Sequence, residues 1–129
     1  MKKSQFDLAP GLTLGRHYFI AEFIGGGWEG EVYKVEERRT GVIRAAKIFY
    51  PARNPRGKAL LRYAHKLNKL RNCPIIIQYH HRDIARVGRE QVEFLVSEFV
   101  DGEMLSDYLA RQRGKRLPYF EALHLLYAL

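Results

Sequence analysis

The fold of this chain is indicated by one stretch, Ile24-Gly25-Gly26-Gly27-Trp28-Glu29-Gly30-Glu31-Val32. Glycines 25, 27 and 30 fit the pattern G-x-G-x-x-G, and Val32 extends it to G-x-G-x-x-G-x-V. Because glycine has no Cβ, such a loop can approach an anion closely and can adopt positive φ. The stretch therefore predicts a turn between two strands that lies over phosphate groups.

The residues after the loop separate it from other phosphate-binding loops. Val32-Tyr33-Lys34-Val35 continues as a strand of β-branched and aromatic residues, whereas the loop of a dinucleotide-binding fold opens a helix. The Gly-Lys-Ser/Thr of a P-loop does not follow either. Further on, Lys47 lies in the otherwise apolar run Ala45-Ala46-Lys47-Ile48. A buried ammonium needs an anionic partner, so phosphate is the partner we expect for Lys47.

These features resemble the amino-terminal lobe of a protein kinase, of the eukaryotic-like Ser/Thr type found in bacteria. The lead-in from Leu8 to Ile20 resembles the run before the first strand of those kinases, and the resemblance continues to residue 129. It covers nearly the whole chain but only the first half of a kinase domain. The resemblance implies phosphoryl transfer from ATP to Ser or Thr hydroxyls of proteins. It implies ATP and Mg²⁺ as cofactors, with the Mg²⁺ ligands in the missing lobe.

The resemblance also assigns the nucleotide-binding residues. Ile24 and Val32 are expected to form apolar walls around the adenine, with Ala45 above the ring. Lys47 is expected to contact the α- and β-phosphates under the glycine-rich loop. Ser97 matches the gatekeeper position before the hinge. The loop and hinge residues carried over are Gly25, Gly26, Gly27, Gly30, Glu98, Phe99 and Val100.

The apolar pattern predicts an α+β fold: a five-stranded antiparallel sheet with one packed helix, then the hinge and the first helices of the carboxy-terminal lobe. The strands are expected at 18–24, 31–36, 42–49, 75–87 and 91–97. An amphipathic helix with a basic outer face is predicted from the spacing of Ala59, Leu60, Tyr63, Leu67 and Leu70. We divide the chain into a lead-in (1–17), an ATP-binding lobe (18–97), a hinge (98–102) and the helices of a truncated second lobe (103–129).

Three departures from the kinase pattern bear on catalysis. The helix glutamate that pairs with the strand lysine in active kinases is replaced by Tyr63 or Ala64. His81-Arg82-Asp83 spells the catalytic-loop signature, but Gly88 stands where that loop carries Asn, and the long helix that should precede it begins only at Pro118. Asp-Phe-Gly is absent. We therefore expect no catalytic residue in this chain.

Two functional hypotheses follow from these departures. The chain is a truncated or split kinase that is not catalytic alone, with a protein substrate or a complementary carboxy-terminal lobe as its partner. The alternative is a pseudokinase-like module that binds nucleotide or protein without catalysis. The apolar run 119–129 also predicts self-association of the isolated chain.

Composition bounds these hypotheses. A chain of 129 residues with 47% hydrophobic residues suits one domain with a core. The formal charge is +8, but the basic residues are scattered and lack interleaved aromatics, so we expect a solvated surface and not a nucleic-acid site. One cysteine excludes an internal disulfide and suits a reducing compartment. No run of eighteen apolar residues occurs, so we expect a cytoplasmic protein without membrane contact.

Overall fold

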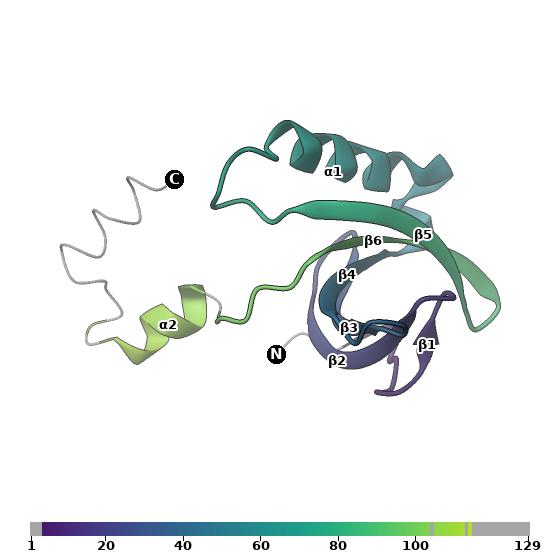
Figure 1. The fold of residues 1–129 in the computed structure, drawn as a ribbon, viewed down its shortest axis with the longest axis horizontal. Coiled ribbons are helices and arrows are strands. Elements are labelled where there is room, and N and C mark those ends of the chain that lie inside the picture. Colours follow the sequence, from purple (N-terminus) through teal and green to yellow (C-terminus); the bar gives the residue numbers. More distant parts are fainter. Residues whose placement is uncertain (1–3, 104, 113, 115–129) are drawn as a thin grey trace. The chain divides into compact units, whose positions relative to one another are not determined.

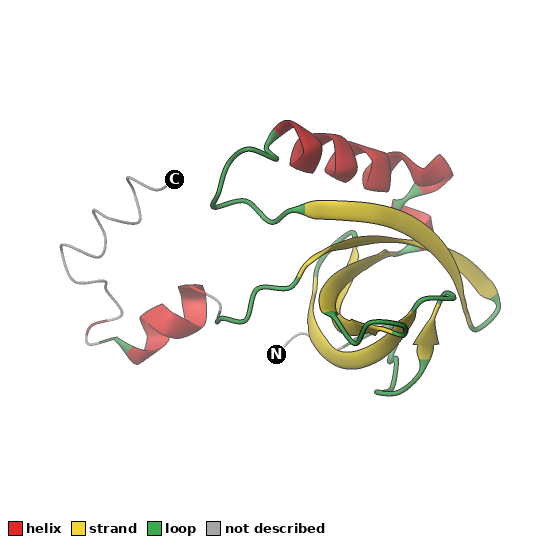
Figure 2. Cartoon of the chain, in the orientation of Figure 1, coloured by secondary structure: helices red, strands yellow, loops and turns green. Residues whose placement is uncertain are grey.

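The computed structural model describes residues 4–103, 105–112 and 114, and their contacts divide the chain into two units. The first runs from Met1 to Phe99 and the second from Val100 to Leu129. Figures 1 and 2 show the elements of each. The strands are β1 (Thr13–Leu14), β2 (Tyr18–Gly26), β3 (Gly30–Glu37), β4 (Ile43–Phe49), β5 (Tyr79–Val87) and β6 (Glu90–Glu98). The helices are α1 (Lys58–Lys69) and, in the second unit, α2 (Leu105–Arg111), and two 3₁₀ turns, Pro51–Arg53 and Pro55–Gly57, precede α1.

The strands of the first unit form one antiparallel sheet in the order β1-β2-β3-β4-β6-β5. Consecutive strands β2, β3 and β4 pair as a meander. The chain then passes through α1 to the edge strand β5, and β6 returns between β5 and β4. In Figure 1 the sheet curls on itself, and α1 runs along β5. The expected α+β fold with an antiparallel sheet and a packed helix is confirmed.

Alternation along β4 divides its side chains between two apolar clusters. Ala46 and Ile48 belong to the larger cluster, which the curled sheet buries. Phe49, on the opposite face, joins Ala59, Leu60 and Leu95 in the smaller cluster beneath α1. Lys47 faces the same way as Phe49, because the two are separated by one residue. The lysine therefore projects on the face of the sheet that carries α1.

The sheet has a sixth strand that the sequence does not indicate. Strand β1 pairs with β2 through only two residues, Thr13 with Phe19 and Leu14 with Tyr18. Gly11 and Gly15 bracket it and both adopt positive φ, so the chain turns sharply on either side. Two residues are too few for an alternation signal, although Leu14 is fully buried.

The predicted fourth strand begins too early. Residues 75–78 precede β5, and the Ile76 amide donates to the Cys73 carbonyl oxygen (3.2 Å) in a turn that contains Pro74. Ile75 and Ile77 remain exposed, so β-branching was misleading here. The end of the predicted helix also needs correction, because Leu70 lies after α1 and is 46% exposed.

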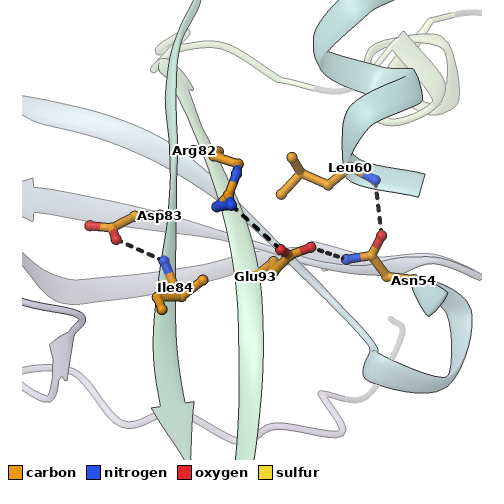
Figure 3. Close-up of polar contacts among 6 residues, drawn as sticks. All are labelled: Asn54, Leu60, Arg82, Asp83, Ile84 and Glu93. Atoms are coloured by element: carbon orange, nitrogen blue, oxygen red, sulfur yellow. Dashed lines mark hydrogen bonds and ion pairs between the residues drawn. The ribbon is translucent and has the colours of Figure 1, made fainter. Parts of the chain in front are cut away.

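The start of α1 is held against β6 by side-chain hydrogen bonds (Figure 3). The Leu60 amide donates to Asn54 Oδ1 (3.1 Å), and Asn54 Nδ2 donates to Glu93 Oε2 (2.8 Å). Arg82 lies 4.0 Å from the other oxygen of Glu93. Asn54 thus satisfies an amide of the first helical turn that has no intrahelical acceptor. This link places the helix relative to the sheet.

Of the helices expected within 103–129, the structure describes α2, which belongs to the second unit. The apolar run 119–129 lies outside the described residues. Among the residues that the structure describes, no helix has both the length and the apolar character needed to cross a membrane.

Candidate functional site

Four of the predicted nucleotide-binding residues share one face of the sheet. Val32 on β3 pairs with Lys47 on β4, and Lys47 pairs with Leu95 on β6. Two pairs along, Ala45 lies opposite Ser97. Cross-strand partners point to the same side, and so do residues two apart in a strand. Strand pairing therefore brings Val32, Ala45, Lys47 and Ser97 together on the face that carries α1. Ile24, near the end of β2, is 47% exposed.

The glycine-rich loop closes the hairpin between β2 and β3. Gly25 pairs with Val32 and Gly26 with Glu31, and the Gly27 amide donates to the Gly30 carbonyl oxygen (2.9 Å). The expected positive φ is absent at all four of these glycines. A Cβ on Gly30 would lie 2.0 Å from the Ile48 carbonyl oxygen, so the packing of β3 on β4 requires glycine there. At Gly25 and Gly27 a Cβ would meet nothing within 4 Å, so the fold itself does not require those two glycines.

Lys47 has partners within the chain, where phosphate was the partner expected. Its Nζ lies 3.5 Å from Glu29 Oε2, and the lysine side chain is 20% exposed. The same nitrogen lies 3.6 Å from the centre of the Tyr63 ring and 5.2 Å from that of Phe49. Tyr63 is one of the two residues expected at the helix glutamate position. Its ring attracts the ammonium by a cation–π interaction but supplies no negative charge.

Glu29 connects the glycine-rich loop to two cations from different elements. Its other carboxylate oxygen lies 3.5 Å from a guanidinium nitrogen of Arg62 on α1. Its backbone carbonyl oxygen accepts a hydrogen bond from the Tyr50 amide at the end of β4 (2.9 Å). Neither Glu29 nor Arg62 was identified from the sequence. No spacing rule relates a loop residue to a helix residue so far along the chain, and only the tertiary structure brings them together.

Trp28 at the loop tip packs on Arg53. The Arg53 guanidinium carbon lies 3.2 Å from the centre of the indole, and 71% of the tryptophan is exposed. Trp28 is the sole tryptophan in the sequence. Its fluorescence therefore reports on the glycine-rich loop without substitution.

The strand that enters the predicted hinge is firmly paired. Ser97 is 9% exposed, and its hydroxyl donates to the Glu98 carbonyl oxygen (3.3 Å). The Glu98 amide donates to the Gln78 carbonyl oxygen (3.0 Å), so that N–H is already used by the residue before β5. Phe99 lies 5.0 Å from the ammonium of Lys34, measured to the ring centre. Val100 belongs to the second unit and is 61% exposed.

A buried carboxylate directly after the loop anchors the amino-terminal segment. Glu31 is fully buried and accepts hydrogen bonds from the hydroxyls of Ser4 (2.8 Å), Tyr33 (2.8 Å) and Tyr50 (2.9 Å). It also accepts from the backbone amides of Gln5 and Phe6. The sequence does not reveal this cluster, because its members come from three separate segments.

These donors control the ionisation of the cluster. Burial raises the pKa of Glu31, but the hydrogen bonds from Gln5, Tyr33, Ser4 and Tyr50 outweigh burial, and the net pKa lies below its ordinary value. Burial raises the pKa of Tyr50 to about 12, together with the hydrogen bond that its hydroxyl donates to Glu31. Glu31 is therefore held as an anion next to Gly30.

His81-Arg82-Asp83 lies in the edge strand β5. The His81 Nε2 is 2.9 Å from the Tyr18 hydroxyl, and Asp83 accepts a hydrogen bond from the Ile84 amide (2.8 Å), which Figure 3 includes. The signature is part of a regular strand, as the sequence predicts.

Comparison with known proteins places this geometry in a class. No family model matches the chain. A putative cyclin-dependent kinase F-2 from Oryza sativa subsp. japonica is 31% identical over 106 residues, which cover 80% of this chain and 32% of that protein. The Mycobacterium tuberculosis PknI kinase domain superimposes over 94% of this chain and 47% of its own, with a TM-score of 0.69 and 24% identity. A double mutant of that domain gives a TM-score of 0.70.

The first unit thus has the fold of a protein kinase amino-terminal lobe. The chain spans about half the length of the solved kinase domains and about a third of the curated relative. The resemblance stated from the sequence is confirmed at the level of the fold.

Proposed function

We propose that this chain is the ATP-binding lobe of a protein Ser/Thr kinase. In this proposal Lys47 binds the α- and β-phosphates, and the loop from Gly25 to Gly30 covers them. Ile24, Val32 and Ala45 contact the adenine, Ser97 lies behind it, and the backbone of Glu98, Phe99 and Val100 pairs with its edge. The proposal includes a protein substrate or a complementary carboxy-terminal lobe as the partner, and a cytoplasmic location.

One observation carries the proposal. Strand pairing gathers Val32, Ala45, Lys47 and Ser97 on one face of the sheet, beside a loop whose glycines at 25 and 27 the fold does not itself need. A glycine that packing does not require is explained when a ligand approaches the backbone closely. An ammonium at the base of such a loop suits the phosphates of a nucleotide.

Catalysis requires more than this lobe supplies. Phosphoryl transfer uses Mg²⁺ to neutralise the phosphates and a carboxylate to orient the acceptor hydroxyl. In the described part of the chain, no group of three or more His, Cys, Asp or Glu residues assembles a metal site. The described residues therefore offer no ready-made cluster of ligands for Mg²⁺. We propose that its ligands, and the catalytic base, come from a second lobe.

Titration with ATP tests the proposal directly, with Trp28 fluorescence or heat as the signal and with and without Mg²⁺. Lys47→Ala should weaken binding about tenfold or more, which corresponds to about 1.4 kcal/mol. Lys66→Ala, on the exposed side of α1, is the matched control because it removes an equal charge. The proposal is wrong if the wild-type chain does not bind ATP, or if Lys47→Ala and Lys66→Ala bind ATP equally tightly.

One feature favours a non-catalytic module as the second candidate. The Lys47 ammonium lies against the Tyr63 ring, where active kinases place a carboxylate on the helix. Tyr63→Glu would restore that charge. If phosphate transfer with added carboxy-terminal lobes is absent from both the wild-type chain and Tyr63→Glu, the binding module is favoured.

A further inference from the structure

Two cations and one carboxylate meet beneath the glycine-rich loop. Lys47 from β4 and Arg62 from α1 each lie 3.5 Å from a different oxygen of the Glu29 carboxylate. Such an arrangement, an anion bridged by an ammonium and a guanidinium, is also how proteins hold phosphate groups.

We propose that Glu29 is an internal phosphate mimic: its carboxylate occupies the anion site of Lys47 and Arg62, and a nucleotide must displace it. Arg62 is then a second phosphate-binding side chain. This inference rests on the proposed nucleotide site and adds to it a competitor and a contact residue.

The backbone favours this competition. The Glu29 carbonyl oxygen accepts from the Tyr50 amide (2.9 Å), so the residue is tied to the end of the same strand that carries Lys47. Trp28, its neighbour, packs on Arg53. A tethered carboxylate competes as an intramolecular ligand, whose effective concentration exceeds that of a free anion at ordinary concentrations.

The surroundings favour exchange of this carboxylate for phosphate. The Glu29 side chain is 27% exposed and that of Arg62 is 61% exposed, so neither ion pair is sealed from water. Partly exposed ion pairs contribute little stability and exchange readily. A polyphosphate brings several negative charges where Glu29 brings one, so it can displace the carboxylate and contact both cations.

The contact also links the loop to the helix. Arg62 belongs to α1, and Glu29 is the only loop residue among those described that forms an ion pair with that helix. When phosphate displaces Glu29, the loop loses this link and the phosphate replaces it. The loop should therefore be closed both without ligand and with nucleotide, and open transiently between them.

The experiment compares binding of inorganic tripolyphosphate and of ATP to the full chain. Glu29→Gln removes the competitor, and Glu36→Gln, exposed on β3, is the control with an equal change in charge. We expect Glu29→Gln to bind both ligands about threefold more tightly, or better, than Glu36→Gln does. In the Glu29→Gln background, Arg62→Gln should weaken the binding of tripolyphosphate and of ATP by about threefold relative to Lys66→Gln.

Hydrogen exchange of the ligand-free chain supplies a second readout. Amides 27–31 should exchange faster in Glu29→Gln than in Glu36→Gln, because the loop has lost its link to Lys47 and Arg62. Circular dichroism of each variant establishes that the fold is retained.

The outcomes separate this inference from the proposed function. If ATP binding depends on Lys47 but Glu29→Gln matches its control, the inference is overturned and the nucleotide site stands. If tripolyphosphate follows the expected pattern while ATP binds no more tightly, the anion site stands and the adenine site fails. If no variant binds either ligand, or Arg62→Gln matches Lys66→Gln, the phosphate-mimic role is overturned.

Discussion

At the scale of single residues, the glycine-rich loop combines two different requirements in one motif. Gly30 is required by the sheet, because the Ile48 backbone occupies the space of a side chain. Gly25 and Gly27 face open space and carry no positive φ. A sequence pattern treats these glycines as equivalent, whereas their physical causes differ.

This difference predicts opposite results for two alanine substitutions. Gly30→Ala should destabilise the fold by about 2 kcal/mol or more, since a Cβ would lie 2.0 Å from the Ile48 carbonyl oxygen and the strands would have to separate. Gly27→Ala is the matched control and should leave stability nearly unchanged. Urea unfolding followed by circular dichroism measures both, and equal effects would contradict the assignment.

Glu31 predicts a pH dependence of stability. Its pKa is lowered in the folded state by the surrounding donors, so its contribution is complete above the unfolded carboxyl pKa of about 4.3 and is lost as the pH falls through the folded value. At pH 7, Glu31→Gln should cost about 1–3 kcal/mol, because donors arranged for a carboxylate lose their acceptor.

The comparison with Glu31→Gln isolates this effect from other acidic groups. The difference in free energy of unfolding between the wild type and Glu31→Gln should shrink as the pH is lowered below about 4. Glu36→Gln, exposed on the same strand, should show no such change. A difference that is constant from pH 7 to pH 3 would contradict the pKa direction.

At the scale of elements, the position of α1 decides what surrounds Lys47. The helix carries Arg62, which lies 3.5 Å from Glu29, and Tyr63, whose ring centre lies 3.6 Å from Lys47 Nζ. It is docked through Ala59 and Leu60 against Phe49 and Leu95. Its first turn is fixed by Asn54 and Glu93 and not by a residue at its own N-cap, Gly57.

Removal of the Asn54 side chain should weaken the attachment of α1 to the sheet. We expect Asn54→Ala to lower stability by about 1–2 kcal/mol, since the Leu60 amide loses its acceptor and Glu93 loses a donor. Asn68→Ala, on the exposed surface of the same helix, is the control. Urea unfolding of both variants gives the comparison, and equal stabilities would show that the cap contributes nothing.

At the scale of the whole molecule, the first unit has the fold of a kinase amino-terminal lobe, and the chain spans about half of the PknI kinase domain that it matches. The apolar run 119–129 lies outside the described residues, so the self-association expected from it stays a prediction from the sequence. We expect the 129-residue chain to self-associate through it, because apolar runs of this kind are normally buried.

Light scattering and sedimentation over a range of concentrations measure this association. A shortened chain that ends at residue 114 should have the mass of a monomer under the same conditions. The prediction fails if the full chain is monomeric at high concentration, or if the shortened chain associates as strongly.

The sequence by itself determined the principal strands, the helix and the position of the glycine-rich loop. Alternating and helical periodicities are local signals, and glycines at fixed spacing are visible without a partner. It also placed Lys47 on the strand that follows that hairpin. Strand β1 was not predicted, because two residues are too few for an alternation pattern. Residues 75–78 were wrongly predicted as strand, because their run of isoleucines resembles one.

Only the tertiary structure decided which charges meet. The pairing of Glu29 with Lys47 and Arg62, and of Glu31 with Ser4, Tyr33 and Tyr50, depends on how the curled sheet brings separate segments together. Charged and hydroxyl side chains occur all along the chain, and their chemistry alone does not specify a partner. Packing of the apolar clusters sets the distances, and electrostatic attraction then acts between the groups placed within reach.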